Sequence, residues 1–396
     1  MFTVKNTGSN YLARIIKLGP PRKHSNADKL LVHTVLFNNI ITDLSYKEND
    51  LVVYFPLECQ INKDFISYIN GFQKKELNKD KEVRGFFDNN SRVRAVKLRG
   101  EPSAGFIIKL EILIKWLESK KIKIDADDVF YTIDVDFDTF NDILICQKYI
   151  VPVKNSGHNL AKQKVARESR IVEGQFHFHV DTKHLKKELN VLKPDDLITI
   201  GYKLHGTSAV FSNILVKKKL SLAARILKKL GLEIIDTKHD YVYSSRKVIK
   251  NDFTDKKHDS YYDHDVWETI NERIKDKIRP GYSIYGEICG QLPSGKYIQN
   301  LYDYGCRENT CEFFVYRITF TDSLNHVIEL TTPQIQRYCE KYQLNTVPIF
   351  YYGRAKNKYP ELDIENHWHE NFLNELIKEY TEKKCYMCKN DVFAEG

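Results

Sequence analysis

The sequence has no apolar run near the ~18 residues that a membrane-spanning helix needs. Its longest apolar stretches, Gly105–Leu110 and Leu51–Leu57, have the length of strands. The N-terminal Met-Phe-Thr-Val-Lys-Asn has neither the apolar core nor the cleavage site of a secretory signal. No internal repeat is visible. These absences predict a soluble, cytoplasmic protein without a membrane partner.

Cysteine is also scarce, with eight residues spread unevenly over the chain. Small secreted domains held by disulfides are far denser in cysteine, so we expect mostly reduced thiols. A structural zinc ion needs about four ligands. Cys385 and Cys388, with Cys306 and Cys311 as the other close pair, leave zinc open as an alternative to ordinary thiols.

Charge of either sign is only slightly in excess. The 396 residues carry 61 Lys and Arg against 53 Asp and Glu, a formal net charge of +8 at pH 7. This falls short of the strongly basic character of a dedicated nucleic-acid-binding protein. Basic stretches at 154–170, 217–219 and 228–229 contrast with an acidic one at 125–142. A polyanionic partner is allowed, and the 42% hydrophobic content is enough to build real cores.

The first 120 residues read as short strands separated by turn-forming residues. The expected strands are Tyr11–Leu18, Leu30–Phe37, Leu51–Leu57, Val93–Leu98 and Gly105–Leu113. A set of short strands in so short a segment is typical of a small closed barrel, since closure removes exposed strand edges. We therefore predict an OB-type β-barrel over residues 1–120.

Four cations alternate with apolar residues on one predicted strand of this barrel: Arg92, Arg94, Lys97 and Arg99. A solvated strand face and a face that follows nucleic-acid phosphates both fit this pattern. The segment Asn26–Leu31 also resembles the corresponding segment of tRNA-binding OB domains. We predict that the barrel binds RNA.

Residues 121–170 are predicted to be a linker that ends in a mobile basic loop, and residues 171–396 a mixed α/β domain. In the second domain, helices are expected at His184–Leu192, Ser221–Leu232, Trp267–Ile278, Pro333–Tyr342 and Glu370–Glu382, and strands at Asp196–Tyr202, Tyr241–Ser245, Tyr282–Glu287 and Glu312–Thr319. The expected fold is therefore α+β with two domains.

Lys203 lies at the end of a predicted strand, and Gly206 opens a tight turn three residues later. A lysine acts as a nucleophile only when its pKa falls from about 10.4, which desolvation or neighbouring cations can bring about. The glycine would let the backbone approach a bound nucleotide closely. Alone, however, Lys-x-x-Gly occurs in many surface turns.

The polar residues that follow in order give this lysine its significance. They are Arg246 in Ser-Arg-Lys, Glu287 in Tyr-Gly-Glu, Tyr316 in Phe-Phe-Val-Tyr-Arg, and Glu395 in Ala-Glu-Gly. Taken singly, each has an ordinary interpretation as a surface cation, a strand-end carboxylate or a core tyrosine. In this order, at the ends of apolar strands, they favour one functional site.

This order resembles the covalent nucleotidyltransferase superfamily of ATP-dependent ligases and capping enzymes. The similar positions are Lys203-Leu-His-Gly-Thr for the RNA-ligase form of motif I, Arg246 for motif Ia, Glu287 for motif III, Tyr316 for motif IIIa and Glu395-Gly396 for the start of motif IV. Arg317 departs from the pattern, because an acidic residue usually follows the motif IIIa aromatic. The stretch around Gln299 and Tyr304 is similar to nick-sealing RNA ligases, and the domain order resembles RNA ligase family five.

The resemblance implies a ligase-type nucleotidyltransferase domain, of ATP-grasp-like mixed α/β form, that joins RNA ends in three steps. Lys203 would attack the α-phosphorus of ATP and form lysyl-AMP, with Gly206 among the nucleotide-binding residues. AMP would then pass to an RNA 5′-phosphate, and an RNA 3′-hydroxyl would attack that activated end.

The same resemblance implies roles for the other residues. Arg246 would hold phosphate or ribose, Glu287 the ribose hydroxyls, and Tyr316 the adenine by stacking. His205 would assist the sealing step. Mg²⁺ or Mn²⁺ would offset the phosphate charge, with Glu395 as a carboxylate ligand. The expected partner is RNA with nicked or duplexed ends, and the expected state is a monomer.

One part of the family pattern is missing. Motif IV usually continues into a strand and then into motif V, a Lys-x-Lys that grips the phosphates, whereas this sequence stops at Gly396. We therefore expect a C-terminally incomplete domain, defective in forming lysyl-AMP. Two alternatives stay open: a non-catalytic RNA-binding remnant of a ligase, and an mRNA-capping guanylyltransferase. The domain order disfavours the second, because its OB domain usually follows the transferase.

Overall fold

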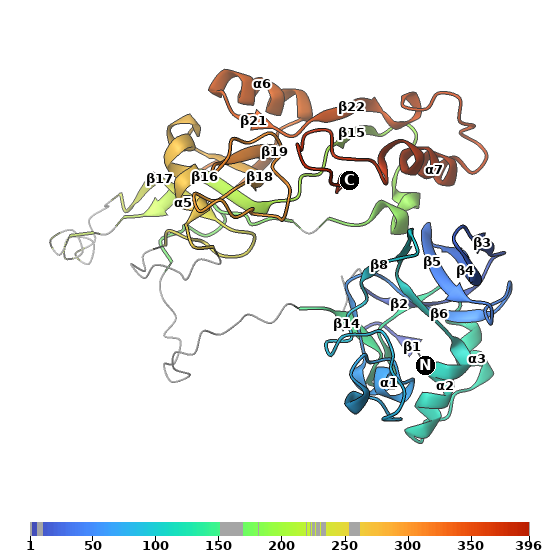
Figure 1. Ribbon diagram of the computed structural model, residues 1–396. Helices are drawn as coiled ribbons and strands as arrows, with labels where there is room; N and C mark the ends of the chain where they lie inside the picture. The colour runs from blue at the N-terminus through green and yellow to red at the C-terminus, as the bar shows by residue number, and fades with distance from the viewer. Residues whose placement is uncertain are drawn as a thin grey trace. The chain divides into compact units, whose positions relative to one another are not determined.

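The computed structural model describes residues 2–5, 11–150, 169–180, 182–218, 220–221, 223, 226, 230, 235–252 and 262–395. The chain divides into two compact units, Met1–Asn159 with Lys183–Glu188, and Leu160–Thr182 with Leu189–Gly396. Figure 1 shows the elements of each unit. None of the described helices is long and apolar enough to cross a bilayer.

Antiparallel strands in small sheets build the first unit (Figure 1). They are β1 (Phe2–Thr3), β2 (Ala13–Lys17), β3 (Arg22–His24), β4 (Ala27–Val35), β5 (Asn38–Asp43), β6 (Leu51–Phe55), β7 (Cys59–Ile61), β8 (Ala95–Leu98), β9 (Glu101–Ala104), β10 (Phe106–Lys109), β11 (Asp136–Phe137), β12 (Thr139–Phe140), β13 (Ile143–Leu144) and β14 (Cys146–Lys148). The main sheet has the order β10-β6-β2-β11, and β3-β4-β5 form a second. The remaining sheets are β1-β12-β13, β14-β7 and β8-β9. No closed barrel is found among the described strands, so the OB-type barrel is not confirmed.

Helical segments complete the core of the first unit. They are α1 (Lys63–Tyr68), η1 (Lys75–Leu77), α2 (Leu110–Ser119), α3 (Ala126–Phe130) and η2 (Leu185–Lys187). Helix α2 buries Leu113, Trp116 and Leu117 against the main core. Burying each such side chain contributes about 1.5–3 kcal/mol, so this face of α2 holds the helix in place.

The strand expected at Gly105–Leu113 is wrong in its second half, because β10 ends at Lys109 and α2 begins at Leu110. The apolar residues beyond Lys109 are buried at helical spacing, which a short apolar run does not distinguish from a strand. Gly105 has φ +132°, and a Cβ there would lie 2.7 Å from the Tyr54 ring. Only glycine fits this approach to the strand beside it.

The expected row of four cations does not lie on one strand, since β8 contains only Lys97 of the four. Arg92 forms an ion pair with Glu58, and the Arg94 guanidinium lies 2.7 Å from Asp88. Local carboxylates therefore already bind two of the four cations predicted to contact phosphates.

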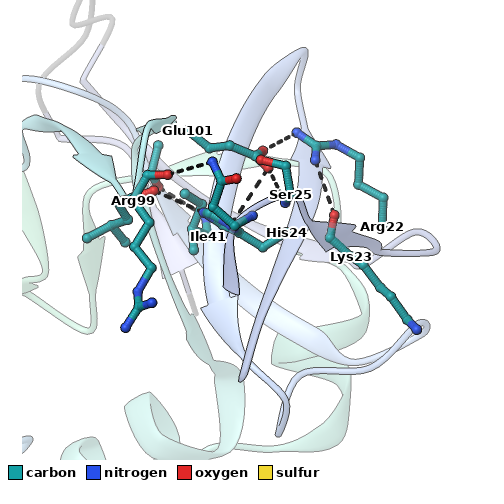
Figure 2. A network of polar contacts seen from close by, with 10 residues as sticks. Arg22, Lys23, His24, Ser25, Ile41, Arg99 and Glu101 are labelled. Carbon is teal, nitrogen blue, oxygen red and sulfur yellow. Dashed lines mark hydrogen bonds and ion pairs between the residues drawn. The ribbon is translucent and has the colours of Figure 1, made fainter. Parts of the chain in front are cut away.

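A polar network around the buried His24 ring joins the β3–β4 turn to the β8–β9 hairpin, as Figure 2 shows. Glu101 accepts hydrogen bonds from the Arg22 guanidinium and, at 2.6 Å, from the Ser25 N–H. The His24 Nε2 lies 3.0 Å from the carbonyl of Leu98, and its Nδ1 accepts the Asn26 N–H at 3.0 Å. The ring is fully buried, so these two bonds select the neutral Nε2–H form.

The second unit is built around a six-stranded sheet. The strands of the whole unit are β15 (Leu197–Gly201), β16 (Thr207–Lys217), β17 (Thr237–Ser244), β18 (Tyr282–Gly290), β19 (Cys311–Thr321), β20 (Val327–Glu329), β21 (Asn345–Thr346) and β22 (Ile349–Arg354). The sheet has the order β17-β16-β18-β19-β20, and β21 pairs in parallel with β19. Strands β15 and β22 form a separate antiparallel pair.

Two helices pack against one face of the large sheet (Figure 1): α5 (Val266–Ile274), continued by η4 (Lys275–Lys277), and α6 (Thr332–Tyr342). Asp265 caps α5 by accepting the N–H groups of Trp267 and Glu268. The core between helices and sheet includes Ala209, Phe211, Trp267, Ile270, Ile284, Ile288, Phe313, Val315, Ile318 and Ile335. Because side chains alternate along a strand, the intervening residues of β16, β18 and β19 face the opposite side.

A β-bulge interrupts the alternation in β19. Tyr285 pairs with Arg317 while its neighbour Gly286 pairs with Val315, so Tyr316 is an extra residue without a partner in β18. Val315 and Ile318 both lie in the helix-facing core. Tyr316 and Arg317 therefore both project from the open face, which is a common effect of a bulge.

The smaller elements of the second unit are η3 (Leu189–Val191), η5 (Ala355–Asn357) and α7 (Trp368–Tyr380). Helices α5, α6 and α7 confirm three of the predicted helices within a few residues. The helix expected at His184–Leu192 is wrong: it consists of two short 3₁₀ turns, and its two ends belong to different units. The predicted helix at Ser221–Leu232 and the predicted basic loop lie largely outside the described residues.

Candidate functional site

Lys203 lies in the short connection between β15 and β16, two residues after β15 ends. Tyr202 and Leu204 on either side are buried, and Tyr202 N donates to the carbonyl of Pro348 at 2.9 Å. The N–H of His205 is hydrogen-bonded to the Tyr304 hydroxyl at 2.6 Å. With its neighbours anchored, Lys203 projects outward, and 65% of its side chain is exposed.

Gly206 has no room for a side chain. A Cβ would lie 2.3 Å from the carbonyl oxygen of Ile288 and 2.8 Å from the Glu287 side chain. Its own carbonyl accepts a hydrogen bond from Gln299 at 3.0 Å. We expected this glycine to make room for a nucleotide, but in the structure it makes room for β18. The lysine connection is thereby held against the strand that carries Glu287.

Glu395 joins the two candidate catalytic residues. One carboxylate oxygen accepts a hydrogen bond from the Lys203 ammonium, and the other lies 2.9 Å from Nδ1 of His205. Burial works to raise the pKa of Glu395, but the hydrogen bonds and charges of His205 and Lys203 outweigh it and lower the pKa below its usual value. Glu395 is thus held as a carboxylate. Gly396, beside it in the predicted motif, lies outside the described residues.

Glu287 projects from the open face of β18, opposite Ser208 of β16. Its carboxylate accepts the Ser208 hydroxyl at 3.2 Å. Burial raises the pKa of Glu287 to about 7, helped by the negative charge of Glu395 and opposed by the bond from Ser208. Near neutral pH, therefore, Glu287 exists in both the protonated and the ionised form.

The bulge residue Tyr316 has its ring beside His179, with the ring centroids 5.5 Å apart, and its hydroxyl is hydrogen-bonded to that histidine. Burial, together with the charge of Glu287, raises the pKa of Tyr316, so its hydroxyl stays protonated. About a third of the residue is exposed, so it does not simply fill the core. Arg317 turns to Glu329, with which it forms two hydrogen bonds of 2.9 and 3.0 Å.

One cavity of about 480 Å³ brings most of the predicted site residues together. Its lining includes Lys203, His205, Arg246, Glu287, Tyr316 and Glu395. Gly206 does not line this cavity but an adjoining one of about 510 Å³. Arg246 enters from the turn after β17, where Ser245 N donates to the carbonyl of Val248 at 2.9 Å. Lys203 and Glu395, which are 192 positions apart along the chain, thus share one site.

Sequence reasoning missed three residues of the site. Ser208 follows the lysine motif, but its bond to Glu287 depends on strand register, which no local pattern gives. Tyr304 was named only as part of the stretch that is similar to nick-sealing RNA ligases, although its hydroxyl anchors the connection that carries Lys203. His179 belongs to the alternating Phe-His-Phe-His segment at 176–179, whose period of two indicated an extended chain with one histidine face.

The cysteines do not add a metal site. No group of three or more His, Cys, Asp or Glu side chains in the described ranges is placed to hold a metal ion. Cys385 and Cys388 are free thiols that pack beside Tyr202 and Leu204. The zinc alternative therefore gains no support.

Comparison with known proteins relates this part of the chain to a known family. Residues 197–384 match the family model described as RNA ligase. No curated protein matches the sequence. Residues 197–384 therefore carry an RNA ligase domain, and the resemblance seen in the sequence is confirmed for this segment.

Solved structures of a Naegleria gruberi RNA ligase are also similar. An apo mutant is 17% identical with a TM-score of 0.49, covering 92% of this chain and 87% of that one. A mutant with AMP and Mn and another with ATP and Mn are each 15% identical with TM-scores of 0.48, covering 92% of this chain and 88% of theirs. Identities and TM-scores this low do not establish a function.

Proposed function

We propose that the protein is an ATP-dependent RNA ligase that joins RNA 3′-hydroxyl and 5′-phosphate ends through lysyl-AMP and adenylylated RNA. One observation carries the proposal. Lys203 and His205 bind the two oxygens of the same carboxylate, Glu395, in a cavity that Arg246 and Glu287 also line. A nucleophile, cations for phosphates and an acceptor for hydroxyl groups are therefore available together.

In the first step the Lys203 nitrogen would bond to the α-phosphorus of ATP while the bond to the pyrophosphate oxygen breaks. The amine must first lose a proton and leave its ion pair with Glu395, because an ammonium has no lone pair with which to attack. Glu395 Oε1 accepts the hydrogen bond from Lys203 and is the group in place to receive that proton. Arg246 would neutralise phosphate charge as it shifts.

Tyr316 and Glu287 would position the adenosine. The partly exposed ring of Tyr316 offers a face for the adenine, and ring stacking on a base contributes about 1–3 kcal/mol. Glu287 lies between Ser208 and the cavity and would accept hydrogen bonds from the ribose hydroxyls in its ionised form. His205 borders the cavity beside Glu395, where it would orient or deprotonate a sealing hydroxyl.

A divalent cation fits the donor set of this cavity. Mg²⁺ and Mn²⁺ prefer oxygen ligands and commonly combine one or two protein carboxylates with substrate phosphates. Glu395 would be the protein ligand, and Glu287 is the other carboxylate of the cavity. Such an ion supplies charge neutralisation of the phosphates.

We further propose that residues 1–120 bind RNA and that 171–396 contain the transferase. On the described surface of the first unit, the side chains of Lys97 and Arg99 are both exposed. Exposed cations are the groups that displace counterions from nucleic-acid phosphates.

The test is incubation with labelled ATP or GTP followed by denaturing electrophoresis. A covalent label formed from ATP, however slowly, should disappear in Lys203→Ala and in Lys203→Arg, since a guanidinium does not deprotonate. Lys341→Ala, an exposed lysine on α6, is the matched control and should label as wild type does. A label from GTP would favour a guanylyltransferase. RNA binding without any label would favour the non-catalytic alternative.

A further inference from the structure

The cavity of about 510 Å³ adjoins the nucleotide cavity and does not contain Lys203. We call it the acceptor cavity. The two cavities share the lining residues His205, Ser208, Arg246 and Glu287. The acceptor cavity adds Thr207, Ser245, Lys247, Tyr262, Trp267 and Gln299. It therefore adjoins the nucleotide cavity at His205 and Arg246 without being lined by the nucleophile.

The geometry of phosphoryl transfer indicates what a cavity beside the nucleotide would bind. The attacking and leaving atoms lie roughly in line on opposite sides of the phosphorus. With AMP attached to Lys203, the phosphorus lies beside this lysine, and the incoming oxygen must approach from the side away from it. The acceptor cavity shares His205 and Arg246 with the nucleotide cavity and is not lined by Lys203, so it is the candidate for this approach.

The charges around the acceptor cavity suit a phosphate. Arg246 and Lys247 line it and are both exposed, and the Lys250 ammonium lies 4.5 Å from the centre of the Trp267 ring. Among the described residues, three nearby carboxylates have other partners, and one of them, Glu287, accepts the Ser208 hydroxyl. Asp263 lies 3.4 Å from the Lys296 ammonium, and Asp265 caps α5. The Thr207 hydroxyl adds a neutral hydrogen-bond donor, and the Ser245 hydroxyl makes only a long 3.4 Å hydrogen bond to the carbonyl of Val248, which a phosphate oxygen would replace.

Aromatic side chains line the same cavity. Trp267 is 4% exposed and fixed by a 3.1 Å hydrogen bond from its indole N–H to the carbonyl of Ser208. The Tyr262 ring lies 5.8 Å from the indole and is only partly buried. A fixed indole beneath a more accessible phenol is a suitable platform for one base, because aromatic stacking tolerates any base.

We propose that the acceptor cavity binds the 5′-phosphorylated end of the RNA strand that receives AMP, with Lys247 and Ser245 at the phosphate and Tyr262 at the terminal base. The inference rests on the proposed function. In this step an oxygen of the RNA 5′-phosphate bonds to the AMP phosphorus, the bond from phosphorus to the Lys203 nitrogen breaks, and the lysine amine takes up a proton. Pyrophosphate leaves toward the same side in the preceding step, so it shares this phosphate chemistry.

The experiment measures equilibrium binding of two labelled nicked RNA duplexes, one with a 5′-phosphate and one with a 5′-hydroxyl at the nick, to the full chain without ATP. Wild type should bind the phosphorylated nick more tightly. Lys247→Ala should reduce this preference by about tenfold, the order expected for one charge-assisted hydrogen bond. Lys341→Ala should keep it. Equal binding of both duplexes by wild type, or an unchanged preference in Lys247→Ala, would overturn the inference.

Two further arms separate the alternatives. Tyr262→Ala should weaken both duplexes equally and Tyr262→Phe neither, with melting curves to confirm folding. Inorganic pyrophosphate should displace only the phosphorylated duplex. If Lys247→Ala weakens pyrophosphate alone, the cavity holds the leaving group and the proposal is wrong. Because no ATP is present, a wild type that prefers the 5′-phosphate but never forms lysyl-AMP would contradict the proposed function and not this inference.

Discussion

Glu101 in the first unit and Glu395 in the second meet the same kinds of partner, a basic side chain and a histidine. Around Glu101 the histidine ring is fully buried, and the carboxylate is 12% exposed. Around Glu395 the lysine is 65% exposed, the histidine 41% and the carboxylate 26%. Both carboxylates have a lowered pKa, which for Glu101 falls to about 2 because of the hydrogen bonds from Arg22 and the Ser25 N–H.

The difference lies in what surrounds each cluster. The polar atoms around Glu101 are directed to other parts of the same two hairpins, so the cluster fixes their turns together (Figure 2). The cluster around Glu395 opens into a cavity that also contains Glu287, whose pKa is about 7. A charged triad alone therefore does not indicate a functional site. The cluster around Glu395 differs in the cavity beside it and in a second carboxylate whose pKa burial raises, and these features make it the candidate site.

The largest effect should come from exchanging the two carboxylates for amides. Glu395→Gln removes the charge that pairs with Lys203 at a phosphoryl-transfer site, and we expect lysyl-AMP formation to slow by about 10²–10³-fold. Glu101→Gln should label at the wild-type rate and lower Tm instead. Initial rates of label incorporation and melting curves, measured for both variants, test these opposite expectations. A similar drop in rate in both would remove the distinction.

The melting curves also have a pH dependence. Because the folded pKa of Glu101 is below its unfolded value, its stabilising contribution is present above about pH 4.3 and disappears as the pH falls toward about 2. Wild type and Glu101→Gln should therefore differ in Tm at pH 6 and converge in acid. If the difference in Tm does not narrow in acid, Glu101 stabilises the fold by its shape and not by its charge.

Glu287→Gln should stabilise the protein at alkaline pH. A carboxyl with a raised pKa costs folding stability as the pH rises from its unfolded pKa near 4.3 through its folded value of about 7. Above that range the cost is about 4 kcal/mol, which the amide avoids. Denaturant unfolding of both proteins at pH 5 and pH 8.5 measures the difference in their free energies of unfolding, which should widen with pH. ATP affinity should rise with pH in wild type only.

Tyr316→Ala should weaken ATP binding by about five- to 150-fold, the equivalent of about 1–3 kcal/mol of stacking. Tyr316→Phe keeps the ring and removes the hydrogen bond to His179, so a much smaller change is expected. Nucleotide titrations beside melting curves distinguish the roles. A large drop in stability with unchanged ATP affinity in the alanine variant would indicate a structural tyrosine.

The smallest effect is expected on the first unit. Replacing Lys97 and Arg99 together by alanine should reduce RNA affinity and lower the slope of log affinity against log salt by ~0.7–0.9 for each phosphate that the variant no longer neutralises. Replacing Arg94, which pairs with Asp88, should change the slope less. Titrations at several salt concentrations give these slopes. Equal slopes in all three proteins would mean that this hairpin does not meet the RNA.

Local patterns predicted the regular parts of the fold. The apolar periodicity around Tyr282–Glu287, Glu312–Thr319 and Pro333–Tyr342 indicated two strands of the large sheet and a helix that packs on it, because burial on one face dictates such spacing. The change from strand to helix at Leu110 was missed, since a short apolar run fits either form. The separate small sheets of the first unit were missed as well, because closure of a barrel depends on pairings between distant strands.

The sequence predicted which residues form the candidate site but not which of them contact one another. Resemblance to ligase motifs named Lys203, Glu287 and Glu395, and the structure brings all three to one cavity. That Glu395 holds Lys203 and His205 at once follows from packing of the C-terminal segment, where Ala394 N donates to the carbonyl of Lys383. That Ser208 faces Glu287 follows from strand register. Neither is encoded within a few residues of sequence.

The bulge in β19 makes that strand unusually tolerant of the deletion of one residue. Deleting one residue from a strand ordinarily reverses every side chain beyond the deletion, exchanging core for solvent. Here, removal of Arg317 would leave Val315, Tyr316 and Ile318 in strict alternation, with the two aliphatic residues still inward and the tyrosine still outward. β19 thus has one residue more than strict alternation needs, and deleting Arg317 would make the strand regular at the loss of its two hydrogen bonds to Glu329.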